Sequence, residues 1–152
     1  MNLSPHFTLA ELEKSNKAIQ LGLDNTSPAE LLPRLIRLAE MLERIRSTLN
    51  VPITVTSGYR GRQLNTAVGG VTSSDHSQGH AADIVAPGFG TPFEVATLLA
   101  PLVTVLGIGQ LLLEHVGNKS WVHLSTRTPQ NPSNRVVTYD GKNYALGIQF
   151  IA

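Results

Sequence analysis

The sequence predicts an α+β domain in which helices pack on a small antiparallel sheet. Leucine and isoleucine recur at steps of three and four in one long segment, which is typical of an amphipathic helix. Short β-branched segments separated by turn residues fill much of the rest. A length of 152 residues suits one domain with its own core. We expect the domain to span residues 1–152, with a core over about 27–127 and a C-terminal β extension over 128–152.

The main helix is expected over residues 33–49. Ser27 and Pro28 form a helix start signal, but Pro33 lies where a proline kinks or breaks a helix. The helix therefore either bends at Pro33 or begins there after a short turn. The apolar positions of its buried face are Leu31, Leu35, Leu38, Leu42, Ile45 and Leu49.

Shorter helices are predicted elsewhere. Capping-box patterns at residues 8–11 and 91–94 each open one, and Pro101 is expected to end or kink the second. A short helix is expected over residues 62–67, whereas residues 16–26 are polar and predicted to be irregular.

Six segments have the composition of strands, and two pairs of them predict hairpins. The turn-rich residues 116–120 join one pair antiparallel, and an Asp140-Gly141 turn joins an edge hairpin. The predicted strands are 53–56, 81–85, 108–115, 121–125, 136–139 and 146–151.

Composition excludes several classes of function. The net charge is +1 and Lys and Arg are scattered, so no basic stripe for nucleic acid is present. Cysteine is absent, which excludes disulfides and thiolate metal sites. Any metal must therefore bind through histidine and carboxylate.

The N-terminus lacks the basic and apolar regions of a signal peptide, and no apolar run approaches the ~18 residues of a membrane span. We expect a soluble monomer made in the cytoplasm. If its substrate lies in the cell wall, a separate lysis system must release it.

The segment Ser74–Asp83 contains two imidazoles and two carboxylates around one glycine. His76 and Asp83 are close enough in sequence to share a borderline cation such as zinc, and His123 on a distant strand supplies a third ligand. Three protein ligands leave one coordination position open, as in catalytic zinc sites. The working hypothesis is a zinc peptidase.

The hairpin register places Glu114 beside His123. A two-residue or a four-residue loop keeps both on one face, whereas a slip of one residue would separate them. Glu114 is therefore our candidate general base, and Asp75 is its main rival. Arg60, at a strand end, could hold the developing oxyanion or clamp a substrate carboxylate.

Other polar residues have weaker claims. His80 is spaced four residues from His76, but Gly79 argues against the helix that this ligand spacing requires, so His80 is expected to line the cleft. His115 should face away from Glu114, and Gln110 should share its face.

Three ordered motifs resemble the D-Ala-D-Ala carboxypeptidase family of zinc peptidases: Ser57-Gly58-Tyr59-Arg60, Ser74-x-His76-x-x-Gly79-x-Ala81-x-Asp83, and Trp121-Val122-His123. The family includes VanX-type dipeptidases and phage or bacterial endopeptidases that cut peptidoglycan peptides, and its fold is similar to the hedgehog amino-terminal domain. The likeness covers about residues 5–127.

The resemblance implies zinc ligands at His76, Asp83 and His123, a transition-state arginine at Arg60 and a serine near the substrate at Ser74. Tyr59 and Trp121 are added as expected substrate contacts. VanX-type members carry the catalytic glutamate three residues before the last histidine ligand, and here that position is Ser120. Glu114 on the paired strand is expected to replace it.

The resemblance implies a zinc peptidase acting on D-amino-acid-containing peptides of peptidoglycan, most simply a phage-type lysis enzyme. Two alternatives are a zinc-bearing binding module without catalysis and a cytoplasmic VanX-like D,D-dipeptidase. The bond that is cut and the choice between endopeptidase and carboxypeptidase stay open.

Overall fold

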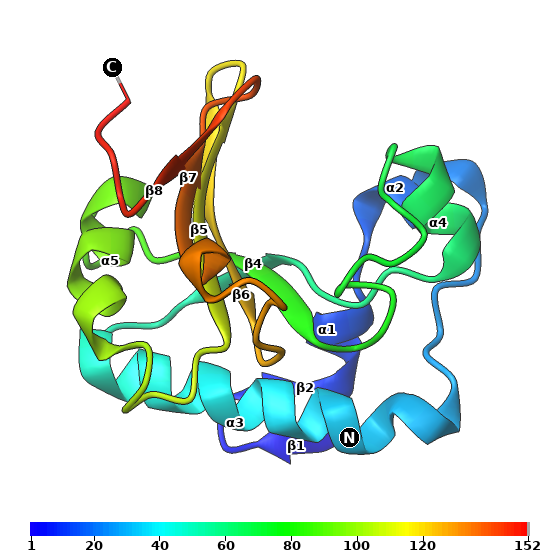
Figure 1. The fold of residues 1–152 in the computed structure, drawn as a ribbon. Helices are drawn as coiled ribbons and strands as arrows, with labels where there is room; N and C mark the ends of the chain where they lie inside the picture. Colours follow the sequence, from blue (N-terminus) through cyan, green and yellow to red (C-terminus); the bar gives the residue numbers. More distant parts are fainter. Residues whose placement is uncertain (152) are drawn as a thin grey trace.

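A six-stranded mixed sheet forms the centre of the computed structural model, which describes residues 1–151 (Figure 1). The strand order is β3-β4-β6-β5-β7-β8, and neighbours are antiparallel except β5 and β7. The strands are β3 (Thr54–Ser57), β4 (Ala81–Val85), β5 (Gln110–Val116), β6 (Lys119–Ser125), β7 (Val136–Tyr139) and β8 (Tyr144–Leu146).

The parallel β5–β7 pair makes the prediction of a wholly antiparallel sheet wrong. The end of β6 lies beside the start of β5, because Ser125 pairs with Gln110. Residues 126–135 carry the chain past β5 at that end, and β7 then starts with Val136 opposite Leu111. This crossing forces β7 to run in the same direction as β5. The mixed α+β class itself is confirmed.

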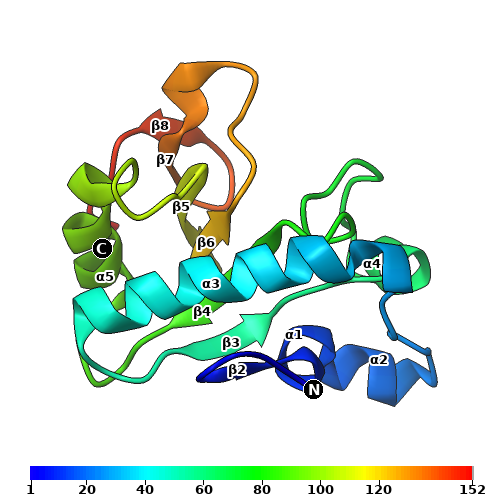
Figure 2. The same ribbon diagram turned by 90° about the horizontal axis from the view of Figure 1, so that it is seen from below.

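Helices cover one face of the sheet and the ends of the molecule. The longest, α3, runs across the sheet in Figure 2, and α5 lies beside its C-terminal end. The helices are α1 (Leu9–Glu13), α2 (Asn16–Leu21), α3 (Leu32–Leu49), α4 (Arg62–Ala67) and α5 (Pro92–Leu99). Short 3₁₀ turns occupy Ala29–Leu31, Ala100–Leu102 and Pro132–Asn134, and a small N-terminal sheet pairs β1 (Asn2–Ser4) with β2 (Phe7–Thr8).

The start of α3 follows the second of the two predicted alternatives. A 3₁₀ turn ends at Leu31, and α3 begins at Leu32 with Pro33 in its first turn, where a missing N–H costs nothing. Ser27 does not cap this helix; its hydroxyl donates to Glu13 at 2.6 Å. At the other end Asn50 closes α3 in the left-handed conformation, with φ 56°.

The core lies between the helices and one face of the sheet. The inner face of α3 is fully buried, and each of its leucines contributes roughly 1.5–3 kcal/mol by burial. Alternation along the strands sends Ile84, Leu111, Leu113, Val122 and Leu124 into this core. The intervening residues of β4, β5 and β6 therefore face the other way, where the candidate site lies.

Two local predictions were wrong. Residues 16–21 form α2, because Ser15 accepts a hydrogen bond from the Ala18 N–H and Gly22 closes the helix at φ 68°. The last strand is Tyr144–Leu146 rather than 146–151. The capping boxes of α1 and α5, the helix α4 and the four central strands are confirmed. None of the described helices combines the length and the apolar character needed to cross a membrane.

Candidate metal centre and active site

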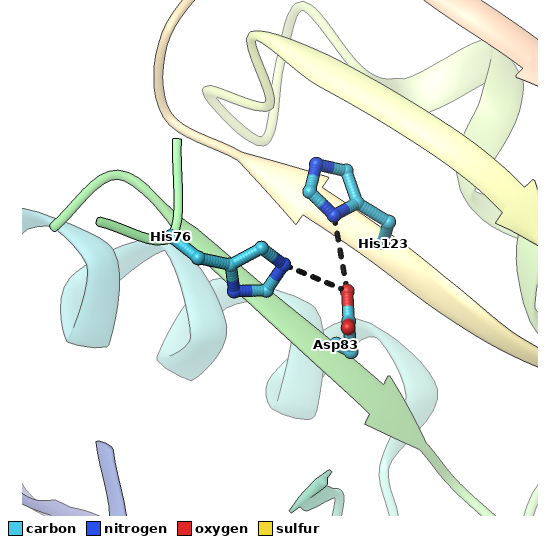
Figure 3. Close-up of side chains that lie close together, drawn as sticks. All are labelled: His76, Asp83 and His123. Carbon is cyan, nitrogen blue, oxygen red and sulfur yellow. Dashed lines mark hydrogen bonds and ion pairs between the residues drawn. The ribbon is translucent and has the colours of Figure 1, made fainter. Parts of the chain in front are cut away.

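Two neighbouring strands and one loop bring His76, Asp83 and His123 together (Figure 3). Asp83 on β4 is the direct cross-strand partner of His123 on β6. His76 reaches them from the loop that precedes β4. Its Nε2 lies 3.2 Å from Asp83 Oδ1, and His123 Nδ1 lies 3.0 Å from the same oxygen. Both imidazoles thus point at one carboxylate.

A backbone carbonyl orients His76. Its Nδ1 lies 2.8 Å from the Gly58 oxygen, and since a carbonyl only accepts, Nδ1 carries the proton and Nε2 keeps its lone pair. Gly58 is itself pressed against α1, where an added Cβ would lie 2.4 Å from the Leu12 oxygen. This is the outer-shell arrangement that fixes the tautomer of metal-binding histidines.

The donor geometry fits a small divalent cation. One ligand atom from each of the three residues lies within 4.8 Å of the others. Two ligands about 2.0–2.1 Å from a tetrahedral zinc are roughly 3.3 Å apart, close to the 3.0 and 3.2 Å found here. Two imidazoles and one carboxylate are donors that zinc accepts, and three protein ligands leave a position for water or substrate.

The electrostatics of the group agree with that role. Burial raises the pKa of Asp83, but the charge and hydrogen bonds of the two histidines outweigh burial and hold this pKa far below its ordinary value. Burial lowers the pKa of His123, but the Asp83 hydrogen bond outweighs it and the net shift is upward. The site therefore binds positive charge beside Asp83, and a cation can supply it in place of a proton.

Glu114 lies beside this group. The β5–β6 hairpin adopts the two-residue-loop register, with Glu114 opposite Trp121 and His123 diagonal on the same face. Glu114 Oε1 is 3.7 Å from His123 Nδ1. Burial and the nearby Asp83 charge raise the pKa of Glu114, which makes it a stronger base than an exposed glutamate.

Arg60 and Ser74 line the same cleft as Glu114 and the His/Asp/His group. Arg60 Nη2 is 3.5 Å from Ser74 Oγ, and its buried Nε has no hydrogen-bond partner within residues 1–151. Burial lowers the Arg60 pKa while the Asp83 and Glu114 charges oppose that shift. A half-buried guanidinium with free donors is suited to an oxyanion or a carboxylate.

These residues line one cleft of about 760 Å³. The sheet supplies one side, through the residues that alternate with the core positions. The segment after β3, the loop before β4 and the segment after β6 supply the rest. Site residues in the lining are Arg60, Ser74, Asp75, His76, Asp83, Gln110, Glu114, Trp121 and His123; others include Leu112, Arg127, Asn134, Val137 and Tyr144.

Three sequence-selected residues lie outside this lining. Tyr59 is only 7% exposed, and its side chain packs in the hydrophobic core next to Arg60 in sequence. His80 faces Thr126, with its Nδ1 3.4 Å from the threonine hydroxyl. His115 turns to the other face of the hairpin, where its Nδ1 lies 2.6 Å from Ser120 Oγ.

Asp75 lines the cleft but its carboxylate is already occupied. Ser125 Oγ donates to one oxygen at 2.9 Å, and Arg127 Nε donates to the other at 2.6 Å. The sequence reasoning missed Ser125 and Arg127. Ser125 carried a signal, because it is two residues from His123 and therefore on the same face of its strand. Arg127 lies beyond the strand, where no periodicity applies.

A family model described as Peptidase M15 matches residues 5–125. One curated relative is the zinc D-Ala-D-Ala carboxypeptidase of Streptomyces albus G, 36% identical over 81 residues. The match covers 52% of this chain and 31% of that protein, so the chain spans about a third of the relative's length. Residues 5–125, which the family model matches, include His76, Asp83, His123 and Glu114. The chain belongs to the M15 peptidase family.

Proposed function

We propose that this chain is a peptidoglycan peptidase that hydrolyses peptide bonds in D-amino-acid-containing stem peptides or cross-links. Zinc is its cofactor, as the His/Asp/His donor set and the family indicate. The observation that supports catalysis most strongly is the position of Glu114 and Arg60 around this donor set in one cleft.

His76, Asp83 and His123 would hold the metal. Bound zinc supplies Lewis-acid chemistry that lowers the pKa of water from about 15.7 towards roughly 7. Glu114 takes a proton from the attacking water while the oxygen of that water bonds to the scissile carbonyl carbon. As the C–N bond breaks, Glu114 returns that proton to the leaving nitrogen. Arg60 donates hydrogen bonds to the carbonyl oxygen while negative charge develops on it.

The proposed wall-peptide substrate rests on the family and on the relative, whose name gives D-Ala-D-Ala as its substrate. The cleft carries two arginines, Arg60 and Arg127, which suits an extended substrate with carboxylates. A role as a phage-type lysis enzyme, single-domain organisation, a monomeric state and the likeness to the hedgehog amino-terminal domain are parts of the same proposal. Ser74 and Trp121 are proposed substrate contacts, since both line the cleft.

The VanX-like alternative has less support. Ser120 occupies the position where VanX-type members have glutamate, and its hydroxyl contacts His115 on the face away from the cleft. A glutamate side chain at this position would start from the wrong face of β6. Glu114 on β5 takes over the base position here, so the active-site architecture differs from that subgroup.

Digestion of purified peptidoglycan tests the proposal. Zinc-loaded protein, chelated protein and a Glu114→Ala variant are incubated with Gram-negative sacculi, and released fragments are identified by mass spectrometry. We expect fragments from the zinc-loaded protein that disappear on chelation and in the variant; their termini identify the bond. A zinc-loaded protein that binds one metal and releases nothing from any wall chemistry would refute catalysis and favour a binding module.

A further inference from the structure

A second polar cluster lies in the cleft beside the metal-binding group. Asp75, Ser125 and Arg127 form a closed set of hydrogen bonds in which Ser125 is central. The Ser125 hydroxyl is fully buried, donates to Asp75 Oδ2 at 2.9 Å and accepts from the Arg127 backbone N–H at 3.0 Å. The Arg127 backbone N–H is thereby held by Ser125, and its side chain by Asp75.

The backbone at Arg127 is also held by packing. Gly109 lies directly against it, and a Cβ at position 109 would come within 2.5 Å of the Arg127 carbonyl carbon. The Gly109 N–H donates to the Ser125 oxygen at 2.8 Å. Arg127 is therefore attached to the rigid end of the β5–β6 hairpin, although it lies beyond the last strand residue.

The guanidinium of Arg127 is anchored at one edge and open at the other. Its Nε donates to Asp75 Oδ1 at 2.6 Å, whereas neither Nη atom has a hydrogen-bond partner within residues 1–151. The side chain is 51% exposed and lines the cleft. Two coplanar Nη donors held in this way match the two oxygens of a carboxylate.

The Asp75, Ser125 and Arg127 cluster lies next to the metal group along β6. Ser125 follows His123 by two residues on the same face of β6, which is about 7 Å along an extended strand. An extended peptide also covers about 7 Å in two residues. A substrate lying along this face with its scissile bond at the metal group would therefore reach Ser125 within about two residues. The Arg127 guanidinium lies next to that position, because it and the Ser125 hydroxyl bind the same Asp75 carboxylate.

We propose that Arg127, positioned by Asp75, binds a carboxylate of the substrate and selects peptides that carry one near the scissile bond. This inference deepens the proposed function and rests on it. The carboxylate has two sources with the same chemistry: the free C-terminus of the peptide, or the side-chain or α-carboxylate of an acidic residue within it. The first source belongs to a carboxypeptidase and the second to an endopeptidase.

Paired synthetic stem peptides test the inference. Each pair differs in a single group, carboxylate or amide, at the C-terminus in one arm and at the internal acidic residue in the other. The kcat/KM ratio of carboxylate to amide peptide is measured for wild type, Arg127→Ala, Arg127→Lys and Asp75→Asn. Arg46→Ala is the matched control, because Arg46 lies near the far end of α3 and does not line the cleft.

We expect the wild type to prefer the carboxylate peptide by about 10- to 100-fold in one of the arms, the range for a charge-assisted hydrogen-bond pair. That preference should disappear in Arg127→Ala, persist in part in Arg127→Lys, weaken in Asp75→Asn and stay unchanged in Arg46→Ala. The arm that responds identifies the source of the carboxylate. If Arg127→Ala lowers kcat/KM equally for both peptides of each pair, the inference is overturned and Arg127 has only a structural role.

A binding measurement separates this inference from the proposed activity. Dissociation constants of the same peptides are measured by calorimetry on Glu114→Ala protein, with and without Arg127→Ala. A lost carboxylate preference supports the inference even if no peptide is cleaved, and an unchanged preference overturns it even if cleavage is efficient. Thermal melting of every variant identifies any that does not fold, in which case Arg127→Lys provides the comparison.

Discussion

Asp83 and Asp75 are two carboxylates that line one cleft but bind different kinds of side chain. Each accepts hydrogen bonds from a residue of β6, and these residues, His123 and Ser125, are two positions apart on one face. Asp83 is surrounded by imidazoles, whereas Asp75 is held by a hydroxyl and a guanidinium.

The two aspartates differ in whether their hydrogen-bond partners can give up a proton. An imidazole that gives up its proton offers a lone pair to a metal, and the Gly58 carbonyl already directs the proton of His76 to the opposite nitrogen. A guanidinium keeps its protons throughout the accessible pH range and offers no lone pair. The Asp83 group can therefore exchange protons for a cation, and the Asp75 group stays a fixed array of donors.

The two clusters also differ in how they relate to the family. His76, Asp83 and His123 all lie within the matched residues 5–125, but Arg127 lies just beyond them. The proposed metal-binding group thus lies in the part of the chain that matches the family model. Part of the cleft wall comes from the segment after it, through Arg127, Asn134, Val137 and Tyr144.

Removing a metal ligand is expected to have the largest effect. Asp83→Asn or His123→Ala should weaken zinc binding by more than about 100-fold, since losing even an outer-shell partner costs roughly 10- to 100-fold. Asp75→Asn should retain one zinc per chain. Metal content after dialysis, measured by atomic emission, distinguishes the two aspartates. If Asp75→Asn loses as much zinc as Asp83→Asn, the two aspartates do not have the different roles proposed here.

Glu114→Gln is expected to separate catalysis from metal binding. The amide cannot accept a proton, so kcat should fall by about 10²- to 10⁴-fold while the zinc content stays at one per chain. Steady-state kinetics on a wall peptide and a metal assay measure the two quantities. Retained kcat in this variant would transfer the base role to another group.

Gly58→Ala is expected to disturb the metal group through its outer shell. The new methyl would collide with the Leu12 carbonyl, at a cost of about 1–3 kcal/mol in the free energy of unfolding. Displacement of the Gly58 oxygen should also weaken zinc binding by roughly 10- to 100-fold.

Gly88→Ala is the control for this substitution, because a Cβ there makes an ordinary contact 3.5 Å from Val51. Urea unfolding and zinc titration test both variants. If Gly58→Ala lowers stability but leaves zinc affinity at the wild-type value, the carbonyl does not orient His76.

The smallest effect is expected at Glu43, a third carboxylate that lies outside the cleft. Burial raises its pKa, but hydrogen bonds from Ser4 and His6 outweigh burial and the net shift is downward. A lowered folded-state pKa stabilises the protein above the unfolded value of about 4.3, and the stabilisation is lost as the pH falls through the folded value.

Glu43→Gln should therefore lower the melting temperature at pH 7, by an amount corresponding to less than about 1 kcal/mol. The difference from wild type should shrink below about pH 4, as the native carboxylate becomes protonated. Calorimetry at pH 7 and pH 3 checks this. A difference that grows on acidification would contradict the assigned direction.

Much of the fold could be predicted because its signals are local. The capping boxes of α1 and α5, the periodicity of α3 and the alternation of β5 and β6 each depend on a few neighbouring residues. The direction of β7 could not be predicted, because it depends on the route of residues 126–135 around the sheet. The helix α2 was missed because polar residues dominate a segment whose two ends are capped.

For the site, the sequence by itself determined the donor types and the face they share. With no cysteine, only histidine and carboxylate were available to a metal, and strand alternation put Glu114 and His123 on one side of the hairpin. Neither conclusion requires knowledge of how distant segments pack.

The tertiary structure alone decided which carboxylate is available. Asp75 and Glu114 were rival bases in the sequence, and the structure gives them different partners. Asp75 accepts hydrogen bonds from Ser125 and Arg127, 50 and 52 residues away, whereas Glu114 lies beside His123. Tyr59, beside Arg60 in sequence, is likewise turned into the core. Hydrogen bonding and burial are set by contacts between distant segments, and these contacts exist only once the chain has folded.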